Sequence, residues 1–267
     1  MNANQPDWNA IAEKFDLWLP YIAPVTEQLI RRLDPGHGER ILDVACGTGE
    51  PALTLARRVG GATIIGVDAA PGMVAVATAK AAREGLDHVR FDTMPGERLD
   101  FADGRFDAVI CRFGVMLFAD PVAGLGEMWR VLRPGGRFAL AVWGEYAENS
   151  SFHMTAQVVE PLLPEGQHTP FDKITSLGIP GTLEAALEAA GFTHFEVTRH
   201  GLDYVFPDFD TWWNLLEASA ILAEQLRHIG PDRRARVRDE IAALAAAYHR
   251  NGQLVLPHVY LVASGQK

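Results

Sequence analysis

Cysteine is scarce in this sequence, and its scarcity excludes two kinds of structure. The 267 residues include two cysteines, Cys46 and Cys111, which stand far apart in apolar segments. Such a pair builds neither a disulfide framework nor a metal-binding cysteine motif, so no bound metal is expected. Unpaired thiols are typical of a reducing compartment, which predicts a cytoplasmic location.

Long hydrophobic runs and positive net charge are also missing. No apolar run approaches the roughly 18 residues that a membrane-spanning helix needs. The first thirty residues contain acids such as Asp7 and Asp16 and lack the pattern of a signal peptide. The formal net charge of −10 disfavours a nucleic-acid partner, because phosphates would be repelled. The densest basic run, in residues 233–238, has acids beside it and is interpreted as a solvated helix face.

From residue 40 onward, short apolar runs alternate with segments of helical periodicity. Alternation of this kind, with apolar strands, indicates a parallel sheet covered on both faces. Before it, residues 8–33 show helical periodicity with expected breaks at Pro20 and Pro24. The expected strands are residues 40–44, 63–68, 89–92, 106–111, 137–143, 194–200 and 254–263, and the expected helices are residues 51–59, 71–84, 121–132, 152–163, 182–190, 208–228 and 232–250.

The expected fold is a Rossmann-like α/β domain with a mostly parallel, seven-stranded sheet and helices on both faces. Its residues are 36–200 and 251–267, preceded by an N-terminal helical cap in residues 1–35. Residues 201–250 are expected to form a helical lid inserted before the last strand. An insertion there would cover the carboxyl edge of the sheet, where open α/β sheets bind ligands. Within the domain, Thr182 and Gly191 are expected to cap one helix at its two ends.

The segment from Ile41 to Glu50 carries the strongest functional signal. A buried strand ends at Asp43 or Val44, and Gly47 and Gly49 follow before a helix begins. Glycines permit a tight turn and let a ligand approach the backbone, and the helix N-terminus offers unpaired N–H groups.

A dinucleotide site is the main alternative for this loop. Gly47, Gly49 and Ala52 fit the loose form of its fingerprint, and Asp68 follows Gly47 by 21 residues, where an acid binds ribose hydroxyls. Asp43 argues against it, because a carboxylate beside two phosphates is repelled. A ligand with a cationic amine and a sulfonium suits an acidic loop better.

The run from Leu42 to Gly49, L-D-V-A-C-G-T-G, resembles the class I S-adenosylmethionine-dependent methyltransferases, especially the branch that includes quinone-biosynthesis enzymes. The resemblance extends over residues 8–143 and more weakly over 182–200 and 254–265. It implies methyl transfer from S-adenosylmethionine to a small molecule. The alternatives are a non-catalytic protein that binds this cofactor and an NAD-dependent oxidoreductase.

The resemblance also implies a cofactor site. Asp43 and the loop would receive the methionine end, Asp68 the ribose hydroxyls, and Arg112 the carboxylate of the cofactor. Pro95 stands where the family carries an adenine-binding aspartate, so Asp92 is considered as a substitute. The full expected set is Asp43, Ala45, Gly47, Gly49, Asp68, Ala69, Met73, Gly96, Glu97, Cys111 and Arg112.

Aromatic residues flank the expected acceptor pocket and favour an apolar or aromatic small molecule, with O-methylation preferred. His153, shortly after the strand 137–143, is the preferred candidate for a general base. No partner besides the small molecule is expected, and a homodimer is left open. The residues expected to face the acceptor are Phe15, Trp18, Tyr21, Phe113, Met116, Trp143 and Trp212.

Overall fold

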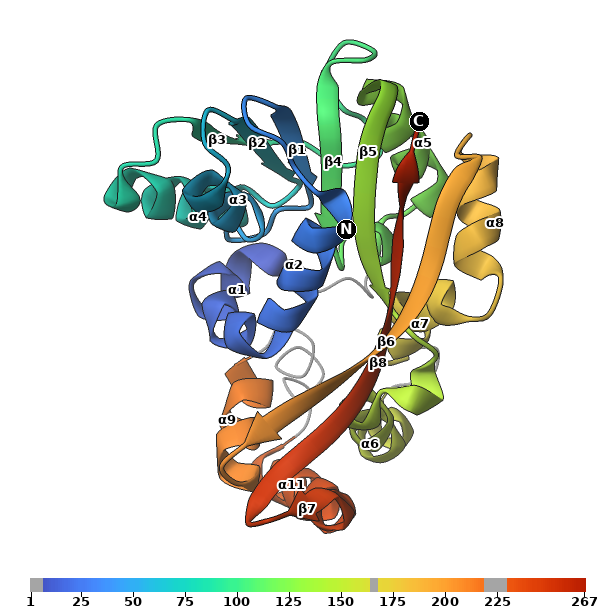
Figure 1. The fold of residues 1–267 in the computed structure, drawn as a ribbon. Coiled ribbons are helices and arrows are strands. Elements are labelled where there is room, and N and C mark those ends of the chain that lie inside the picture. Colours follow the sequence, from blue (N-terminus) through green and yellow to red (C-terminus); the bar gives the residue numbers. More distant parts are fainter. Residues whose placement is uncertain (1–6, 164–167, 219–229) are drawn as a thin grey trace.

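The computed structural model describes residues 7–163, 168–218 and 230–267, and it has the expected Rossmann-like α/β architecture (Figure 1). The main path of the sheet has the strand order β3-β2-β1-β4-β5-β8-β6, and a two-residue strand, β7 (His249–Arg250), pairs with β8 beside that path. Strands β1 to β5 are parallel, whereas β8 runs antiparallel to both β5 and β6. The strands of the path are β1 (Arg40–Val44), β2 (Thr63–Asp68), β3 (Val89–Thr93), β4 (Phe106–Arg112), β5 (Leu132–Trp143), β6 (His194–Phe206) and β8 (Gln253–Gln266).

Helices pack on the sheet because the central strands are apolar along almost their whole length. In β1, for example, every residue after Arg40 is buried. Helix α2 packs on β4 and β5, and α5 packs on β5 and α8. The described α-helices are α1 (Trp8–Phe15), α2 (Leu19–Leu33), α3 (Ala52–Arg58), α4 (Pro71–Glu84), α5 (Pro121–Val131), α6 (Ser150–Val159), α7 (Phe171–Thr175), α8 (Thr182–Ala189), α9 (Phe209–Ala218) and α11 (Pro231–Ala245).

The N-terminal helices break at a different place from the expected one. Helix α1 ends at Phe15, a 3₁₀ turn covers Asp16–Trp18, and α2 begins at Leu19 with Pro20 in its first turn. Proline is tolerated there because the first N–H groups of a helix have no intrahelical acceptor. The expected break at Pro24 is wrong, since Pro24 lies inside α2 on its exposed side.

The caps of α8 match the prediction at one end only. Gly181, with φ +84°, is the N-cap, and Thr182 is the first helical residue. The Thr182 hydroxyl donates backward to the Ile179 carbonyl over 2.7 Å, so it is not free to cap the helix. At the other end Gly191 adopts φ +103° just past the helix, as predicted for a C-terminal glycine.

The pair of strands β6 and β8 extends well past the carboxyl edge of the parallel strands. The last residue of β5, Trp143, pairs with Tyr260, whereas β6 and β8 stay paired as far as Phe206 and Leu254. Residues 201–206, expected in the lid, therefore belong to the sheet. This two-stranded extension leads to α9 and α11 (Figure 1). The part of the expected helix 208–228 beyond Ala218 lies outside the described residues.

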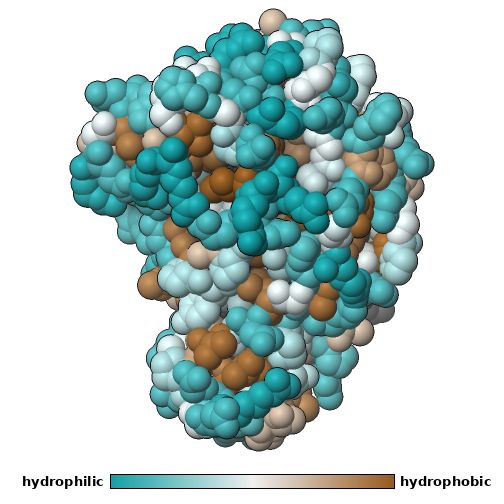
Figure 2. Space-filling model, in the orientation of Figure 1, coloured by the Kyte–Doolittle hydropathy of each residue, from teal (hydrophilic) through white to brown (hydrophobic). Residues whose placement is uncertain are grey.

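The face of the molecule in Figure 2 is largely hydrophilic, with an apolar patch on the lower lobe. Arg233, Arg234 and Arg236 are exposed on α11, in keeping with a solvated helix face. No described helix combines the length and the apolar character that crossing a bilayer requires.

Candidate functional site

Asp43 lies where β1 ends, and its side chain is fully buried. Its Oδ2 accepts a hydrogen bond from the backbone N–H of Ala52, the first residue of α3, over 2.9 Å. Its Oδ1 has no hydrogen-bond partner among the described residues. Burial raises the pKa of this carboxyl to about 8. Because an unsatisfied buried oxygen is unfavourable, Asp43 fits a site that receives a donor or a cation.

Between β1 and α3 the chain passes through backbone conformations that favour glycine. Gly47 has φ +53° and Gly49 has φ +105°, and even Ala45 has φ +57°. A Cβ on Gly49 would lie 2.7 Å from Leu53 Cδ1, so packing also demands glycine there. The loop thus presents bare backbone at the start of α3, where the N–H groups of Ala52 and Thr54 are already bonded to the carboxylates of Asp43 and Glu50.

Asp68, at the end of β2, is joined directly to this loop. Its Oδ2 accepts a hydrogen bond from the Gly47 N–H, and its Oδ1 accepts one from the Ala70 N–H, both over 2.9 Å. Burial raises the pKa of the Asp68 carboxyl. Ala69 is exposed, and Met73 is buried on α4. The structure therefore places Asp68, the expected ribose residue, against the glycine loop.

Helix α1 packs on α4 and covers the glycine loop. Trp8 and Phe15 pack on a small apolar cluster that contains Met73, and the Gly72 N–H donates to Asn9 Oδ1 over 2.8 Å. A Cβ on Gly47 would lie 3.7 Å from Phe15 Cε1. Phe15, expected to face the acceptor, thus lies over the cofactor loop.

Asp16 connects this N-terminal cover to the loop below it, a link that the sequence analysis missed. Its carboxylate accepts hydrogen bonds from Thr48 Oγ1 over 2.5 Å and from Lys80 Nζ over 2.9 Å. Lys80 is only 8% exposed. We call this set of three side chains the Asp16 latch.

The segment after β3 approaches the same edge through its backbone. Gly96 is buried, and a Cβ there would clash with the ring of Phe118. The Glu97 carboxylate accepts a hydrogen bond from the Ala119 N–H over 2.8 Å, which leaves the Glu97 backbone as the group for an adenine edge. Asp92 is half-buried and lies 3.4 Å from the guanidinium of Arg90.

The end of β4 lies directly against the end of β1. A Cβ on Gly114 would clash with the Ala45 side chain and stand 2.7 Å from Cys111 Sγ. Cys111 is fully buried, and burial raises the pKa of its thiol to about 12. The Cys111 side chain therefore lines the site as a neutral thiol. Met116, in the turn that follows, is also buried.

Arg112, the last residue of β4, is 8% exposed. Its Nη1 donates a hydrogen bond to Thr26 Oγ1 on α2 over 2.7 Å. Within the described residues no carboxylate forms an ion pair with it. Burial lowers the pKa of the guanidinium, and negative charge on Asp43 and Glu50 opposes that shift. Arg112 therefore joins the end of β4 to α2.

Five aromatic side chains gather beyond these strand ends, and we call them the aromatic cluster. Phe113 stacks on Trp143 with ring centroids 4.0 Å apart, and Tyr204 on β6 lies 6.3 Å from Trp143. Tyr21 and Trp18 approach Tyr204 to 5.8 Å and 6.0 Å. Four of the residues expected to face the acceptor are thus brought together. Tyr204, the residue that connects them, was missed.

His258 on β8 was also passed over in favour of His153. It is 1% exposed, its ring lies 4.1 Å from that of Tyr204, and burial lowers its pKa to about 3. With Nδ1 donating to the Leu256 carbonyl over 2.9 Å, Nε2 accepts from the Ser151 hydroxyl over 2.5 Å. The ring is thus neutral and has a partner at each nitrogen. On β6, Leu202, Tyr204 and Phe206 occupy every second position, and this alternation could have revealed that β6 turns Tyr204 inward.

His153 and Trp212 lie apart from the aromatic cluster. His153 is exposed on α6, with its ring 5.4 Å from Tyr146. Trp212 is buried on α9 beside Phe209, and its Nε1 has no hydrogen-bond partner among the described residues. No ring contact in the described part of the chain joins either residue to the aromatic cluster.

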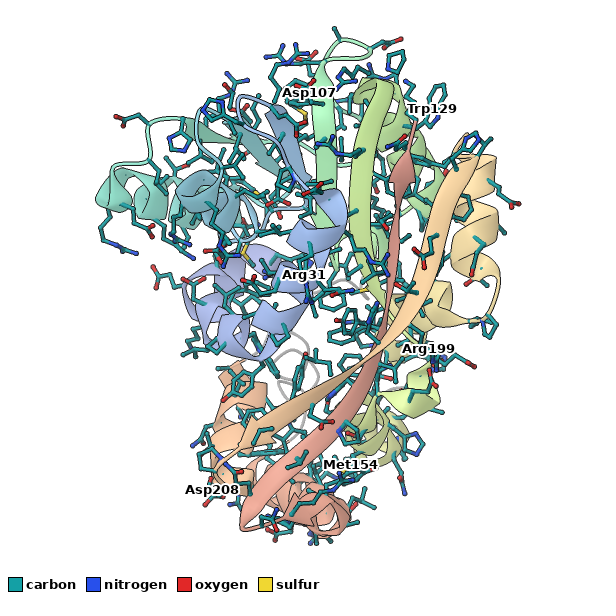
Figure 3. All side chains as sticks on the ribbon, in the orientation of Figure 1. Arg31, Asp107, Trp129, Met154, Arg199 and Asp208 are labelled. Atoms are coloured by element: carbon teal, nitrogen blue, oxygen red, sulfur yellow. The ribbon has the colours of Figure 1, made fainter. Side chains whose placement is uncertain are left out.

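Charged groups at the opposite end of the sheet have an architectural role. Asp107, labelled in Figure 3, lies near the start of β4 and accepts hydrogen bonds from the side chain of Arg133 and the backbone of Arg40. These contacts join the amino ends of neighbouring strands, at the end of the sheet away from the glycine loop.

The strand order, the acid before a glycine loop after β1 and the second acid after β2 together define the class I methyltransferase fold and its cofactor edge. Comparison with known proteins agrees. A family model described as a methyltransferase domain matches residues 41–136. The nocamycin O-methyltransferase of Saccharothrix syringae is 31% identical over 264 residues, which cover 92% of this chain and 91% of that protein.

Two further relatives support the assignment. The demethylmenaquinone methyltransferase of Thermus thermophilus is 37% identical over 175 residues, covering 61% of this chain and 79% of its own. The crystal structure of the YcgJ protein from Bacillus subtilis superposes with a TM-score of 0.64 at 21% identity, over 92% of this chain and 98% of that one, which shows the shared fold. The chain belongs to the class I S-adenosylmethionine-dependent methyltransferase family, and S-adenosylmethionine is its methyl donor for small molecules.

Proposed function

We propose that this enzyme methylates an oxygen atom of a small apolar or aromatic acceptor, bound at the aromatic cluster. The observation that carries the proposal is the position of this cluster. Phe113 directly follows Arg112 at the end of β4, beside the glycine loop, and Trp143 ends the neighbouring strand. Flat rings at the strand ends suit an acceptor with a planar apolar body.

The cofactor would lie along the carboxyl edge between α1 and the strand ends. The buried, unpaired Oδ1 of Asp43 suits the ammonium group of its methionine end, and Asp68 suits the ribose hydroxyls. The loop residues Ala45, Gly47 and Gly49 would approach it through backbone. Met73 and Ala69 would lie against the adenine ring, and Gly96 and Glu97 would meet its edge. Cys111 would lie beside the methionine part.

The cofactor supplies a methyl group that is already activated by the sulfonium charge. The chain then needs to hold the acceptor oxygen in line with that methyl group and to exclude water. Rings on β5, β6 and α2 would perform both tasks. Residues 1–35 as a cap and residues 207–250 as a lid, without the sheet residues 201–206, complete the proposed division of the chain. A cytoplasmic location and a homodimer stay predictions.

The name of the Saccharothrix relative supports oxygen as the acceptor atom. A panel of phenols, enols, carboxylic acids and amines, assayed with cofactor labelled on the methyl group, tests this proposal. We expect label in oxygen-methylated products and a higher melting temperature with S-adenosylhomocysteine, but not with NAD. Transfer to amines alone would contradict oxygen methylation, and stabilisation without any transfer would favour a non-catalytic protein.

A further inference from the structure

The end of β4 holds a buried cation with one side-chain hydrogen bond among the described residues. Arg112 is 8% exposed, and its hydrogen bond to Thr26 engages one of the five N–H donors of the guanidinium. A charge out of water is unfavourable unless an opposite charge lies close to it. The fold therefore retains a cation that lacks a directly bonded carboxylate in the described part of the chain.

The acids that act on this guanidinium differ in charge from the groups of the aromatic cluster. Negative charge on Glu50 and Asp16, and on Asp43 once it is ionised, favours the protonated guanidinium. The aromatic cluster begins at Phe113, the residue after Arg112, and its polar group on β6 is the phenol of Tyr204, which is 3% exposed and which burial keeps neutral by raising its pKa. His258, packed on Tyr204, is neutral and has both ring nitrogens occupied. Among the described residues, no anion is hydrogen-bonded to Arg112.

We propose that Arg112 binds the acceptor oxygen as an anion, so that the acceptors are acidic oxygen compounds such as enols, phenols or carboxylic acids. This inference rests on the proposed function above and assigns Arg112 to the acceptor in place of the cofactor carboxylate. Amines that are protonated in water are then rejected, because an ammonium group would be placed beside a buried cation.

The methyl transfer that follows needs no base in the site. The acceptor loses its proton to water before or during binding, because the guanidinium favours the ionised form. The oxygen anion attacks the methyl carbon. A new O–C bond forms, the C–S bond breaks, and its electron pair goes to sulfur, which becomes a neutral thioether. The methylated product carries no charge at that oxygen and loses its attraction to Arg112, which favours its release.

Binding of a matched pair of probes tests the inference. 2-Naphthoate and 2-naphthylmethylammonium share one flat bicyclic body and differ in charge. Their affinities are measured by calorimetry on enzyme saturated with S-adenosylhomocysteine, for the wild type, Arg112→Met and Arg112→Lys. Arg83→Met is the control, since Arg83 is exposed on α4. The affinity of each variant for S-adenosylhomocysteine is measured separately.

We expect the wild type to bind naphthoate at least about tenfold more tightly than the ammonium probe. Arg112→Met should lose that preference while its affinity for S-adenosylhomocysteine changes by less than about threefold. Arg112→Lys, which keeps the charge and guards against a folding defect, should retain part of the preference, and Arg83→Met all of it.

Three results would overturn the inference. These are equal affinity of the wild type for both probes, no binding of either probe, and an unchanged preference in Arg112→Met. Arg112→Met enzyme that loses S-adenosylhomocysteine while keeping the preference would assign Arg112 to the cofactor carboxylate. Wild-type enzyme that fails to bind S-adenosylhomocysteine would instead contradict the proposed function itself.

Discussion

The two halves of the carboxyl edge are built in different ways. Around the glycine loop, contacts are short hydrogen bonds between backbone and carboxylate, such as Gly47 to Asp68 and Ala52 to Asp43, each over 2.9 Å. In the aromatic cluster, rings from α2, β5, β6 and the residue after β4 meet with centroids 4.0–6.3 Å apart. The first half fixes the position of individual atoms, whereas the second offers apolar surfaces.

This difference separates a constant task from an adjustable one. Every S-adenosylmethionine enzyme of this fold binds the same cofactor. A site built from backbone groups in fixed positions, which tolerates few substitutions, is suited to a ligand that does not vary. An acceptor pocket made from side chains can be reshaped by substitution without changing the sheet. We therefore expect substitutions in the glycine loop to act on the cofactor and substitutions in the aromatic cluster to act on the acceptor.

The largest effect is expected for Gly49→Val, which breaks the cofactor half. Gly49 has φ +105°, and its Cβ position lies 2.7 Å from Leu53 Cδ1, so valine adds backbone strain and a clash at once. Affinity for S-adenosylhomocysteine should fall by more than about a hundredfold, or about 2.7 kcal/mol. Calorimetry measures the affinity, and circular dichroism checks that the variant folds.

Gly85→Ala is the matched control for that substitution. Gly85 also has a positive φ, +66°, but no atom lies within 4 Å of its Cβ position. Only the conformational cost of about 1 kcal/mol should appear, as a loss of stability without a loss of affinity. Equal losses of affinity in the two variants would contradict the role of packing at Gly49.

The pH dependence of cofactor binding sharpens the same comparison. Burial raises the pKa of Asp43 to about 8, so below that pH the free enzyme holds this carboxyl protonated and neutral. Binding the ammonium group favours the carboxylate and releases the proton. Affinity for S-adenosylhomocysteine should therefore fall as pH decreases below about 8, by up to about tenfold per pH unit.

Two controls isolate Asp43 as the cause. Asp43→Asn should bind S-adenosylhomocysteine more weakly at pH 8 and lose the pH dependence, because its side chain does not titrate. 5′-Methylthioadenosine, which lacks the amino acid part, should bind the wild type with little pH dependence. A steep dependence for this shorter ligand would place the titrating group elsewhere.

A smaller effect is expected at the Asp16 latch. Asp16→Asn weakens the bonds to Thr48 and Lys80 that hold the N-terminal cover on the loop. A partly exposed ion pair of this kind contributes about 0.5–1 kcal/mol, so affinity for the cofactor should fall about two- to fivefold. Glu13→Gln, exposed on α1, is the control. An unchanged Asp16→Asn enzyme would mean that the cover does not assist binding.

The same division explains what could be predicted from the sequence. Asp43, Gly47, Gly49 and Asp68 belong to short strand–loop–helix units, so their order along the chain reveals their arrangement. The helix caps needed finer detail, and Thr182 was assigned wrongly because it is the first helical residue and its hydroxyl bonds the Ile179 carbonyl.

The acceptor half depends on contacts between distant residues. Arg112 bonds Thr26 across 86 residues of sequence, and Tyr204 meets His258 because β6 pairs with β8. Neither contact follows from local periodicity. The length of β6 could have been predicted from its alternating pattern, whereas its ring partners depend on how the whole sheet is ordered.

The smallest effect is expected for His153→Ala, the variant that tests the predicted general base. His153 is exposed, and the acceptor proposed above arrives as an anion, so no proton needs to be removed during transfer. Turnover should change by less than about twofold, since loss of a general base typically removes a factor of about 10²–10⁴. The rate is measured from pH 6 to 9 with an acceptor found in the panel. A large loss, together with a lost pH inflection, would restore His153 as the base and would argue against anionic binding at Arg112.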